Sequence, residues 1–205
     1  MKLTSTSIVP GERIPARNAM GRPDPDIHAT FSDNLSPQLA WSEVPAATKS
    51  FVVIMFDDSA PTSLKYVNKE GARLGTDIPR ANFFHWILID LPADVTELPE
   101  GAHSSGVTVG GKPGPKAPAG GRHGVNNYRE FFGSDPQLGG EYYGYDGPFP
   151  PWNDDVVHNY TITVYALNVD RLPIKGSFDG PTALAAMQGH ILDSASFTAT
   201  YSIAH

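Results

Sequence analysis

Two runs of apolar residues, one of them holding a single histidine, constrain the fold of this chain most strongly. FVVIMF occupies Phe51–Phe56, and FFHWILI occupies 83–89 with His85 inside it. An apolar run of this length that does not alternate with polar residues is typical of a strand buried on both faces. We therefore expect both runs to be central strands of a sheet.

Glycine and proline divide the rest of the chain into short segments. There are 20 Gly and 19 Pro among 205 residues, gathered between the apolar segments, which is typical of a loop-rich β fold. Beyond the two apolar runs, we expect strands at 27–31, 39–41, 160–167 and 197–203, after an irregular arm at 1–26. Because 40% of the residues are apolar, the chain can form one sizeable core, and a single domain over 1–205 is expected.

Helices are expected at only two places. Residues 63–82 are polar and basic, which is typical of an exposed insertion, with one helical turn near Leu64–Lys69. Pro181 suits the first position of a second helix. The apolar face of that helix would carry Leu184, Met187, Ile191, Leu192 and Ala195. The chain is thus expected to be mainly β, with a few short helices that include a C-terminal one.

Charge and composition exclude several classes of function. With 15 Lys+Arg against 22 Asp+Glu, the net charge is −7, which disfavours binding to nucleic acid or to an anionic membrane surface. The chain has no cysteine, so no disulfide and no thiolate ligand or nucleophile is available. No apolar segment approaches the roughly 20 residues of a membrane span, and no signal-peptide core is visible. We expect a cytoplasmic protein without membrane insertion.

Three polar residues near strand ends are candidates for a site. Asp57 follows the first apolar run, His85 lies in the second, and His158 follows the proline-rich turn Gly147–Pro151. Since prolines fix φ, this turn is stiff and can shape a small pocket beside the histidine. Asp57 and His85 also have a plainer interpretation, because Asp57 suits a turn or a helix cap and a lone histidine in an apolar strand is more often a core residue.

The long tract before that turn has no recognisable nucleotide-binding motif. Residues 106–124 are rich in Gly and Pro, and a loop of this length is either functional or mobile. GGKPGPK lacks the spacing of a phosphate-binding P-loop, and there is no G-x-G-x-x-G.

Several motifs in fixed order resemble the phosphatidylethanolamine-binding protein family, and most of all its bacterial Raf-kinase-inhibitor-like branch. They are SPQLAWSEVP, FDDSAPT, FFHWILIDLPADVTELPEG and GPFPPWNDDVVHNYTITVYAL, and the resemblance spans 31–201. It implies a β-sandwich of antiparallel-rich sheets with a small pocket for phosphate-like or carboxylate anions, including phospholipid head groups.

The resemblance also implies which residues line that pocket. They are Asp57, His85, Gly147, Pro150, Pro151, His158 and Tyr160. Two positions depart from the family pattern, because Asp58 replaces a proline and Ser59 replaces a second acid. The insertion before His85 is also longer than the bacterial branch suggests. Histidines in such a pocket are expected to act as charged donors to an anion, and Asp57 to accept from an ammonium or hydroxyl group of the ligand.

Three functions follow as hypotheses. The first is a binding protein for a phosphoryl-bearing small molecule, head group or phospho-residue, with a regulatory or kinase-inhibitor-like role. The second is a hydrolase that uses Asp57, His85 and His158, although neither H-E-x-x-H nor G-x-S-x-G is present. The third is an interaction module with a vestigial pocket, in which 63–82 contacts a protein partner. We expect no cofactor and no metal, and exposed strand edges are compatible with a homodimer.

Overall fold

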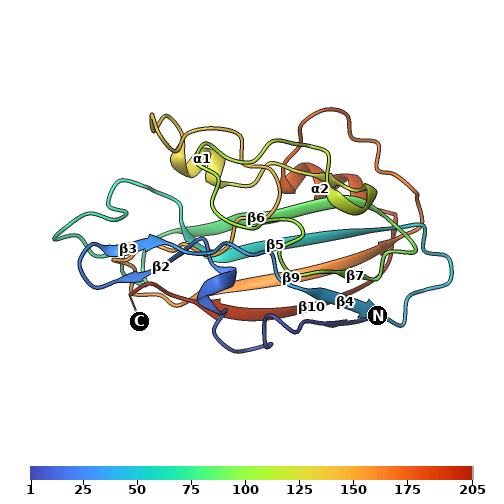
Figure 1. Ribbon diagram of the computed structural model, residues 1–205, viewed down its shortest axis with the longest axis horizontal. Helices are drawn as coiled ribbons and strands as arrows, with labels where there is room; N and C mark the ends of the chain where they lie inside the picture. Colours follow the sequence, from blue (N-terminus) through green and yellow to red (C-terminus); the bar gives the residue numbers. More distant parts are fainter. Residues whose placement is uncertain (205) are drawn as a thin grey trace.

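The computed structural model describes residues 1–204, in which three antiparallel sheets form most of the regular structure (Figure 1). The largest sheet has the order β10-β9-β5-β6-β8, with bounds Ile191–Tyr201, His158–Leu167, Ser50–Pro61, Arg80–Pro92 and Arg122–His123. A smaller sheet joins β1 (Lys2–Thr4), β4 (Leu39–Ser42) and β7 (Glu97–Leu98). A third pairs β2 (Gly21–Asp24) with β3 (His28–Phe31). The expected antiparallel β-sandwich is confirmed.

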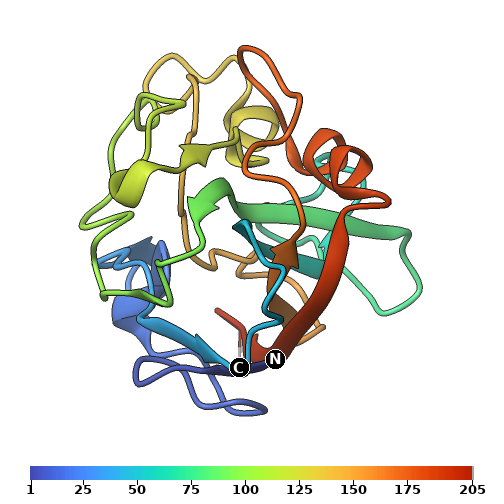
Figure 2. The same ribbon diagram turned by 90° about the vertical axis from the view of Figure 1, so that its right-hand side faces the viewer.

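The central strand β5 explains why its sequence does not alternate. Phe51 and Val53 pack into the main core with Trp41 of the smaller sheet, whereas Val52 and Ile54 pack into a second core on the other face of the large sheet. Successive side chains of a strand point to opposite faces, so a strand covered on both sides is apolar throughout. Figure 2 shows the small sheet and the C-terminal helix on opposite sides of the large sheet.

Helices are few and short. They are the 3-10 turns η1 (Ala16–Asn18) and η2 (Pro118–Gly120) and the α-helices α1 (Tyr128–Phe132) and α2 (Gly180–Met187). At the start of α2, the Asp179 carboxylate accepts a hydrogen bond of 2.9 Å from the Thr182 amide, as a helix cap does. No helix in residues 1–204 has the length and apolar character of a membrane span.

The C-terminal helix is shorter than the apolar pattern predicts. It ends at Met187, and Gly189 adopts a left-handed conformation with φ of 79°, which turns the chain. The expected helical residues Ile191, Leu192 and Ala195 belong to β10. Of the five apolar residues assigned to one helical face, three therefore belong to the edge strand.

Three other expectations are corrected. The arm at 1–26 contains β1 and β2. β5 continues to Pro61, so Asp57 lies inside a strand and neither ends it nor caps a helix. The segment Leu64–Lys69 forms turns and no helix.

The insertion between β5 and β6 packs against the loop that follows the proline-rich turn. The Asn153 side chain accepts a 2.9 Å hydrogen bond from the Asn68 amide and donates to the carbonyls of Tyr66 and Ala72. Leu74 of the insertion also forms a bridge with Asp154. The insertion is therefore fastened to this loop along much of its length.

Candidate functional site

Three neighbouring strands bring the candidate side chains together at one end of the large sheet. Asp57 of β5 lies opposite Tyr160 of β9 and, on its other side, opposite Phe83 of β6. His85 is two residues beyond Phe83 and therefore shares its face of the sheet. His158 begins β9. All five side chains line one cavity of about 230 Å³.

The two histidines converge on that cavity, as the resemblance to the family implies. The ring of Tyr160 lies between them, with centroid distances of 5.2 Å to His85 and 6.4 Å to His158. Pro150 and Pro151 of the stiff turn line the same space. Gly147 does not line it. The Gly147 amide instead donates to the Asn34 side chain, and its carbonyl accepts from the Tyr128 hydroxyl, so it supports the turn from behind.

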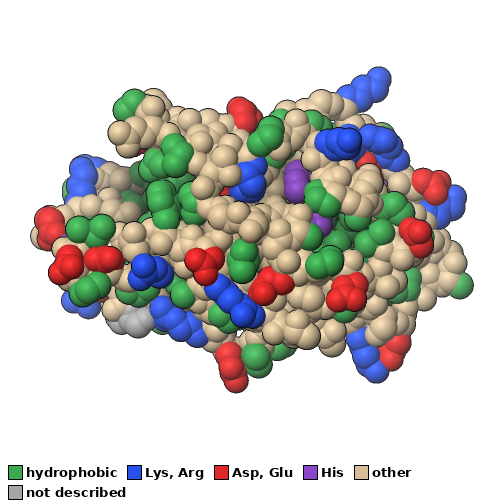
Figure 3. Space-filling view, in the orientation of Figure 1, with side chains coloured by type: hydrophobic (Ala, Val, Ile, Leu, Met, Phe, Trp, Pro, Cys, Tyr) green, Lys and Arg blue, Asp and Glu red, His purple; other side chains and the backbone are tan. Residues whose placement is uncertain are grey.

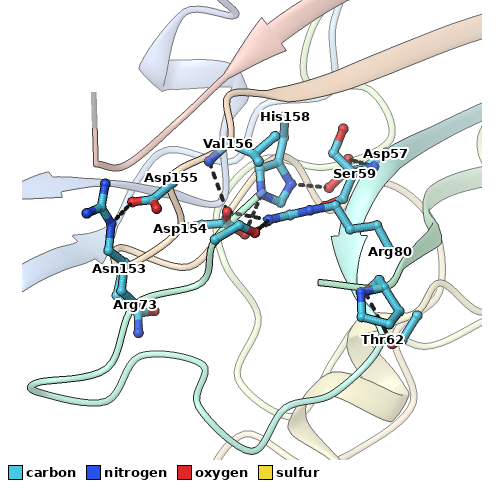
Figure 4. A network of polar contacts seen from close by, with 12 residues as sticks. Asp57, Ser59, Thr62, Arg73, Arg80, Asn153, Asp154, Asp155, Val156 and His158 are labelled. Carbon is cyan, nitrogen blue, oxygen red and sulfur yellow. Dashed lines mark hydrogen bonds and ion pairs between the residues drawn. The ribbon is translucent and has the colours of Figure 1, made fainter. Parts of the chain in front are cut away.

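His158 is held between two carboxylates (Figure 4). Its Nδ1 lies 2.6 Å from Asp57 Oδ2, and its Nε2 lies 3.1 Å from Asp154 Oδ2. Since a carboxylate only accepts, both ring nitrogens must donate, which requires the charged imidazolium. Burial disfavours this charge, but the hydrogen bonds to Asp154 and Asp57 outweigh it and raise the pKa of His158 to about 9.

Asp154 has a second cationic partner, Arg80. The guanidinium contacts both carboxylate oxygens, at 2.9 Å and 2.8 Å, and also donates to the Ser59 carbonyl. Burial alone would raise the pKa of Asp154, but the hydrogen bonds from His158 and Arg80 lower it to about 2. The result is a network of four charged side chains. It joins the carboxylates of Asp57 and Asp154 to the cations of His158 and Arg80, so the charges balance.

His85 has a different protonation state. Its Nδ1 lies 2.8 Å from the Asp146 carbonyl, so Nδ1 donates. Burial lowers the pKa of His85, and the opposing attraction of Asp57 does not compensate. The neutral ring therefore carries its proton on Nδ1 and presents the lone pair of Nε2, which has no hydrogen-bond partner among the described residues.

The comparisons with known proteins are consistent with this geometry. The model of the phosphatidylethanolamine-binding protein family matches residues 4–202. The chain belongs to this family. The UPF0098 protein YbhB of Escherichia coli K12 is 33% identical over 202 residues, covering 98% of this chain and all of that protein. The crystal structure of E. coli YbcL, described as a member of the mammalian PEBP family, has a TM-score of 0.70 at 26% identity, covering 98% of this chain and 97% of that one.

A second solved structure of the family is also similar. The putative PEBP homologue CT736 of Chlamydia trachomatis matches with a TM-score of 0.63 and 27% identity, covering 98% of this chain and 96% of that one. Both neighbours therefore span almost the whole fold, including the strands that carry the cavity.

The departures of this chain from the family pattern lie beside Asp57. The Ser59 amide donates to Asp57 Oδ1 at 2.7 Å, while Asp57 Oδ2 is the oxygen that contacts His158. The Ser59 hydroxyl donates to Asp58, whose side chain is exposed. Both oxygens of Asp57 therefore already accept hydrogen bonds within the chain, and its principal contact is with His158.

The charge expected on the two histidines is correct for only one of them. His158 is charged, but both of its N–H groups are used by Asp57 and Asp154. His85 is neutral and offers an acceptor to the cavity. The expectation that both histidines are charged donors to a ligand is therefore wrong, because the sequence could not reveal that burial and a backbone carbonyl set the state of His85.

Three polar residues of the site were missed by the sequence analysis. Asp154 and Arg80 fix His158, and the buried Asp146 carboxylate accepts from Asn34, Asn126 and Lys112 beneath the turn. A signal was present for Asp154, which stands four residues before His158 in the motif already singled out. Within the described part of the chain, no group of three or more His, Asp or Glu side chains is arranged to hold a metal ion.

The most unusual polar atom of the cavity is the Tyr160 hydroxyl. Tyr160 is only 1% exposed, and its hydroxyl has no hydrogen-bond partner in residues 1–204. An unpaired buried hydroxyl costs roughly 1–3 kcal/mol. Two residues that line the cavity therefore carry an unpaired polar atom: the Tyr160 hydroxyl and Nε2 of the His85 ring.

Proposed function

We propose that this cavity is a receptor for a small molecule that carries a phosphoryl or carboxyl group. The observation that supports it is that Tyr160, whose buried hydroxyl is unpaired, lines the same cavity as His85, whose Nε2 is unpaired. The hydroxyl can donate and Nε2 can accept. A singly protonated phosphoryl group, or a protonated carboxyl group, has an oxygen that can accept from the Tyr160 hydroxyl and an O–H that can donate to Nε2 of His85.

The charges around the cavity favour a ligand of low charge. The four ionised groups of the Asp57–His158–Asp154–Arg80 network cancel, and both ring N–H groups of His158 are engaged within it. A phosphate dianion would therefore enter a site without a net positive charge. Burying an unbalanced double negative charge is costly. Binding of a phosphoryl group in its monoanionic form, or protonation of His85 as the dianion binds, lowers that cost.

A hydrolase receives less support from the same geometry. A general base needs a lone pair that faces the substrate. In His158 both ring nitrogens donate to carboxylates, and in Asp57 both oxygens already accept. His85 alone retains a free lone pair, and its Nδ1–H is held by a backbone carbonyl with no carboxylate partner to stabilise the imidazolium directly.

Titration calorimetry with inorganic phosphate and with O-phosphoethanolamine tests the proposal. We expect saturable binding to the intact chain, and about tenfold weaker binding to Tyr160→Phe, since loss of one hydrogen bond to a charged group costs roughly 1.5 kcal/mol. Tyr165→Phe is the matched control, because Tyr165 lies on the same strand but packs against the second core.

A further variant tests the acceptor. His85→Asn can keep a donor to the Asp146 carbonyl while removing Nε2, and we expect it to weaken binding as well. Absence of binding to either compound at millimolar concentration, or equal binding by Tyr160→Phe and the intact chain, would contradict the proposal.

A further inference from the structure

Three phenylalanines line the cavity beside its polar floor, together with the polar residues Asn82, Asn127 and Glu130. Phe83 of β6, Phe131 of α1 and Phe149 of the proline-rich turn all line it, and all three are only partly buried. Phe83 and Phe131 meet edge to face with centroids 6.3 Å apart. Figure 3 shows hydrophobic side chains gathered around a hollow between α1 and the insertion.

The far side of the cavity is largely apolar. Leu64 of the insertion lines it and is 47% exposed, and Ala60 and Pro61 from the end of β5 line it together with the polar Thr62. A ligand that consisted of a phosphoryl group alone would occupy the floor and leave these surfaces in contact with water. Apolar surface that stays wet contributes nothing to affinity, whereas a ligand that covers it gains from burial.

The volume of the cavity matches a ring with one small substituent. A cavity of about 150 Å³ lined by apolar side chains is sufficient to bind benzene. The cavity here has about 230 Å³. After one six-membered ring is placed, the remaining space is about that of two to three water molecules, each of which takes roughly 30 Å³ in the liquid. This is room for one acid group beside the ring.

Resting on the proposed function, we infer that the ligand is a small aromatic acid, a single ring that carries one phosphoryl or carboxyl group. The acid group contacts the Tyr160 hydroxyl and Nε2 of His85, and the ring packs against Phe83 and Phe131. An aromatic ring is favoured over an aliphatic ring of the same size because aromatic pairs gain from edge-to-face and offset contacts beyond the area they bury.

Three phosphate compounds separate the contributions of the acid group and of the ring. Inorganic phosphate tests the floor alone, cyclohexyl phosphate adds an apolar ring, and phenyl phosphate adds an aromatic one. By calorimetry we expect phenyl phosphate to bind at least about tenfold more tightly than inorganic phosphate. We expect it to bind about fivefold more tightly than cyclohexyl phosphate.

Two variants of one helix provide the matched comparison. Phe131→Leu removes the ring that lines the cavity and keeps an apolar side chain. Phe132→Leu removes the neighbouring ring, which packs on Tyr128 and Tyr142 and does not line the cavity. We expect Phe131→Leu to reduce the preference for phenyl over cyclohexyl phosphate and Phe132→Leu to keep it in full, with both variants first checked for cooperative thermal unfolding.

The outcomes distinguish this inference from the proposed function. Equal binding of phenyl and inorganic phosphate, both sensitive to Tyr160→Phe, would overturn the aromatic ligand and leave the acid receptor in place. Loss of preference in Phe132→Leu but not in Phe131→Leu would also overturn it. If phosphatidylethanolamine vesicles compete with phenyl phosphate at lower concentration, a lipid head group is the better ligand and the inference is wrong. Absence of binding by all of these compounds would overturn both.

Discussion

At the scale of single residues, the site depends on two buried histidines that differ in charge. His158 lies between two carboxylates and is charged, whereas His85 has a backbone carbonyl as its hydrogen-bond partner and is neutral. Both are almost fully buried, so exposure does not distinguish them. What distinguishes them is the hydrogen-bonding partner of each ring, and this partner decides which histidine can offer a lone pair to a ligand.

The pKa of His158 predicts how stability changes with pH. A folded-state pKa raised from 6.5 to about 9 gives a contribution that is fully present below pH 6.5 and is lost as pH rises through 9. Since a pKa difference of one between the folded and unfolded states corresponds to roughly 1.4 kcal/mol, the contribution of His158 is about 3 kcal/mol. Urea unfolding between pH 6.5 and 9.5 should therefore show a falling free energy of unfolding.

The matched variant for that measurement is His158→Gln, which cannot become charged. We expect it to be less stable than the intact chain at pH 6.5 and to lose most of the decline toward pH 9. A variant with the same decline as the intact chain would show that another group titrates in this window.

At the scale of elements, segments distant in sequence fix the position of the cavity wall. The insertion between β5 and β6 is held by Asn153 and, through Gly75, by Arg80. On the other side, Lys112 of the Gly/Pro-rich loop forms an ion pair with the buried carboxylate of Asp146, with 2.5 Å between Nζ and Oδ1. Since the backbone of Asp146 pairs with His85, this loop supports the site without lining the cavity.

The ion pair of Lys112 gives a prediction for that loop. Lys112→Met leaves Asp146, whose side chain is 1% exposed, without its cation, and breaking a buried pair in this way costs roughly 3–5 kcal/mol. Because Asn34 and Asn126 still donate to the carboxylate, we expect a loss near the lower end, about 3 kcal/mol, by urea unfolding.

Two further variants provide the controls. Lys116→Met in the same loop changes an exposed lysine and should alter the free energy of unfolding by less than about 0.5 kcal/mol. Lys112→Met combined with Asp146→Asn should recover part of the loss, since no unpaired charge then remains. Equal stability of Lys112→Met and Lys116→Met would show that the contact to Asp146 carries little energy.

At the scale of the whole molecule, the arrangement is a sandwich whose core ends in a polar floor. Residues of β5 and β9 that face the main core are apolar along most of each strand, as at Met55 and Ile162, and become Asp57 and Tyr160 at one end. Because side chains alternate between the two faces of a strand, Asp57 and Tyr160 lie on the same face as the apolar core residues, at one end of the sheet. The stiff turn and the insertion then enclose that place.

Much of this could be predicted from the sequence, because the strongest signals are local. The apolar runs predict β5 and β6, and the resemblance that the ordered motifs carry implies the convergence of Asp57, His85 and His158. What could not be predicted depends on tertiary contacts. Arg80 and Asp154 are 74 residues apart and meet only in the folded chain. The apolar pattern after Pro181 fits a helix and a strand equally over a few residues, so the end of α2 was misplaced.

The central claim is that Nε2 of His85 and the Tyr160 hydroxyl together receive an acid group. The most direct measurement is the ¹⁵N chemical shift of the His85 imidazole while inorganic phosphate is added near pH 7. The account predicts that Nε2 starts at the shift of an unprotonated ring nitrogen and moves toward a hydrogen-bonded or protonated value, with a much smaller movement in Tyr160→Phe. An Nε2 that is already protonated without phosphate, or a shift that stays constant up to saturating phosphate, would contradict it.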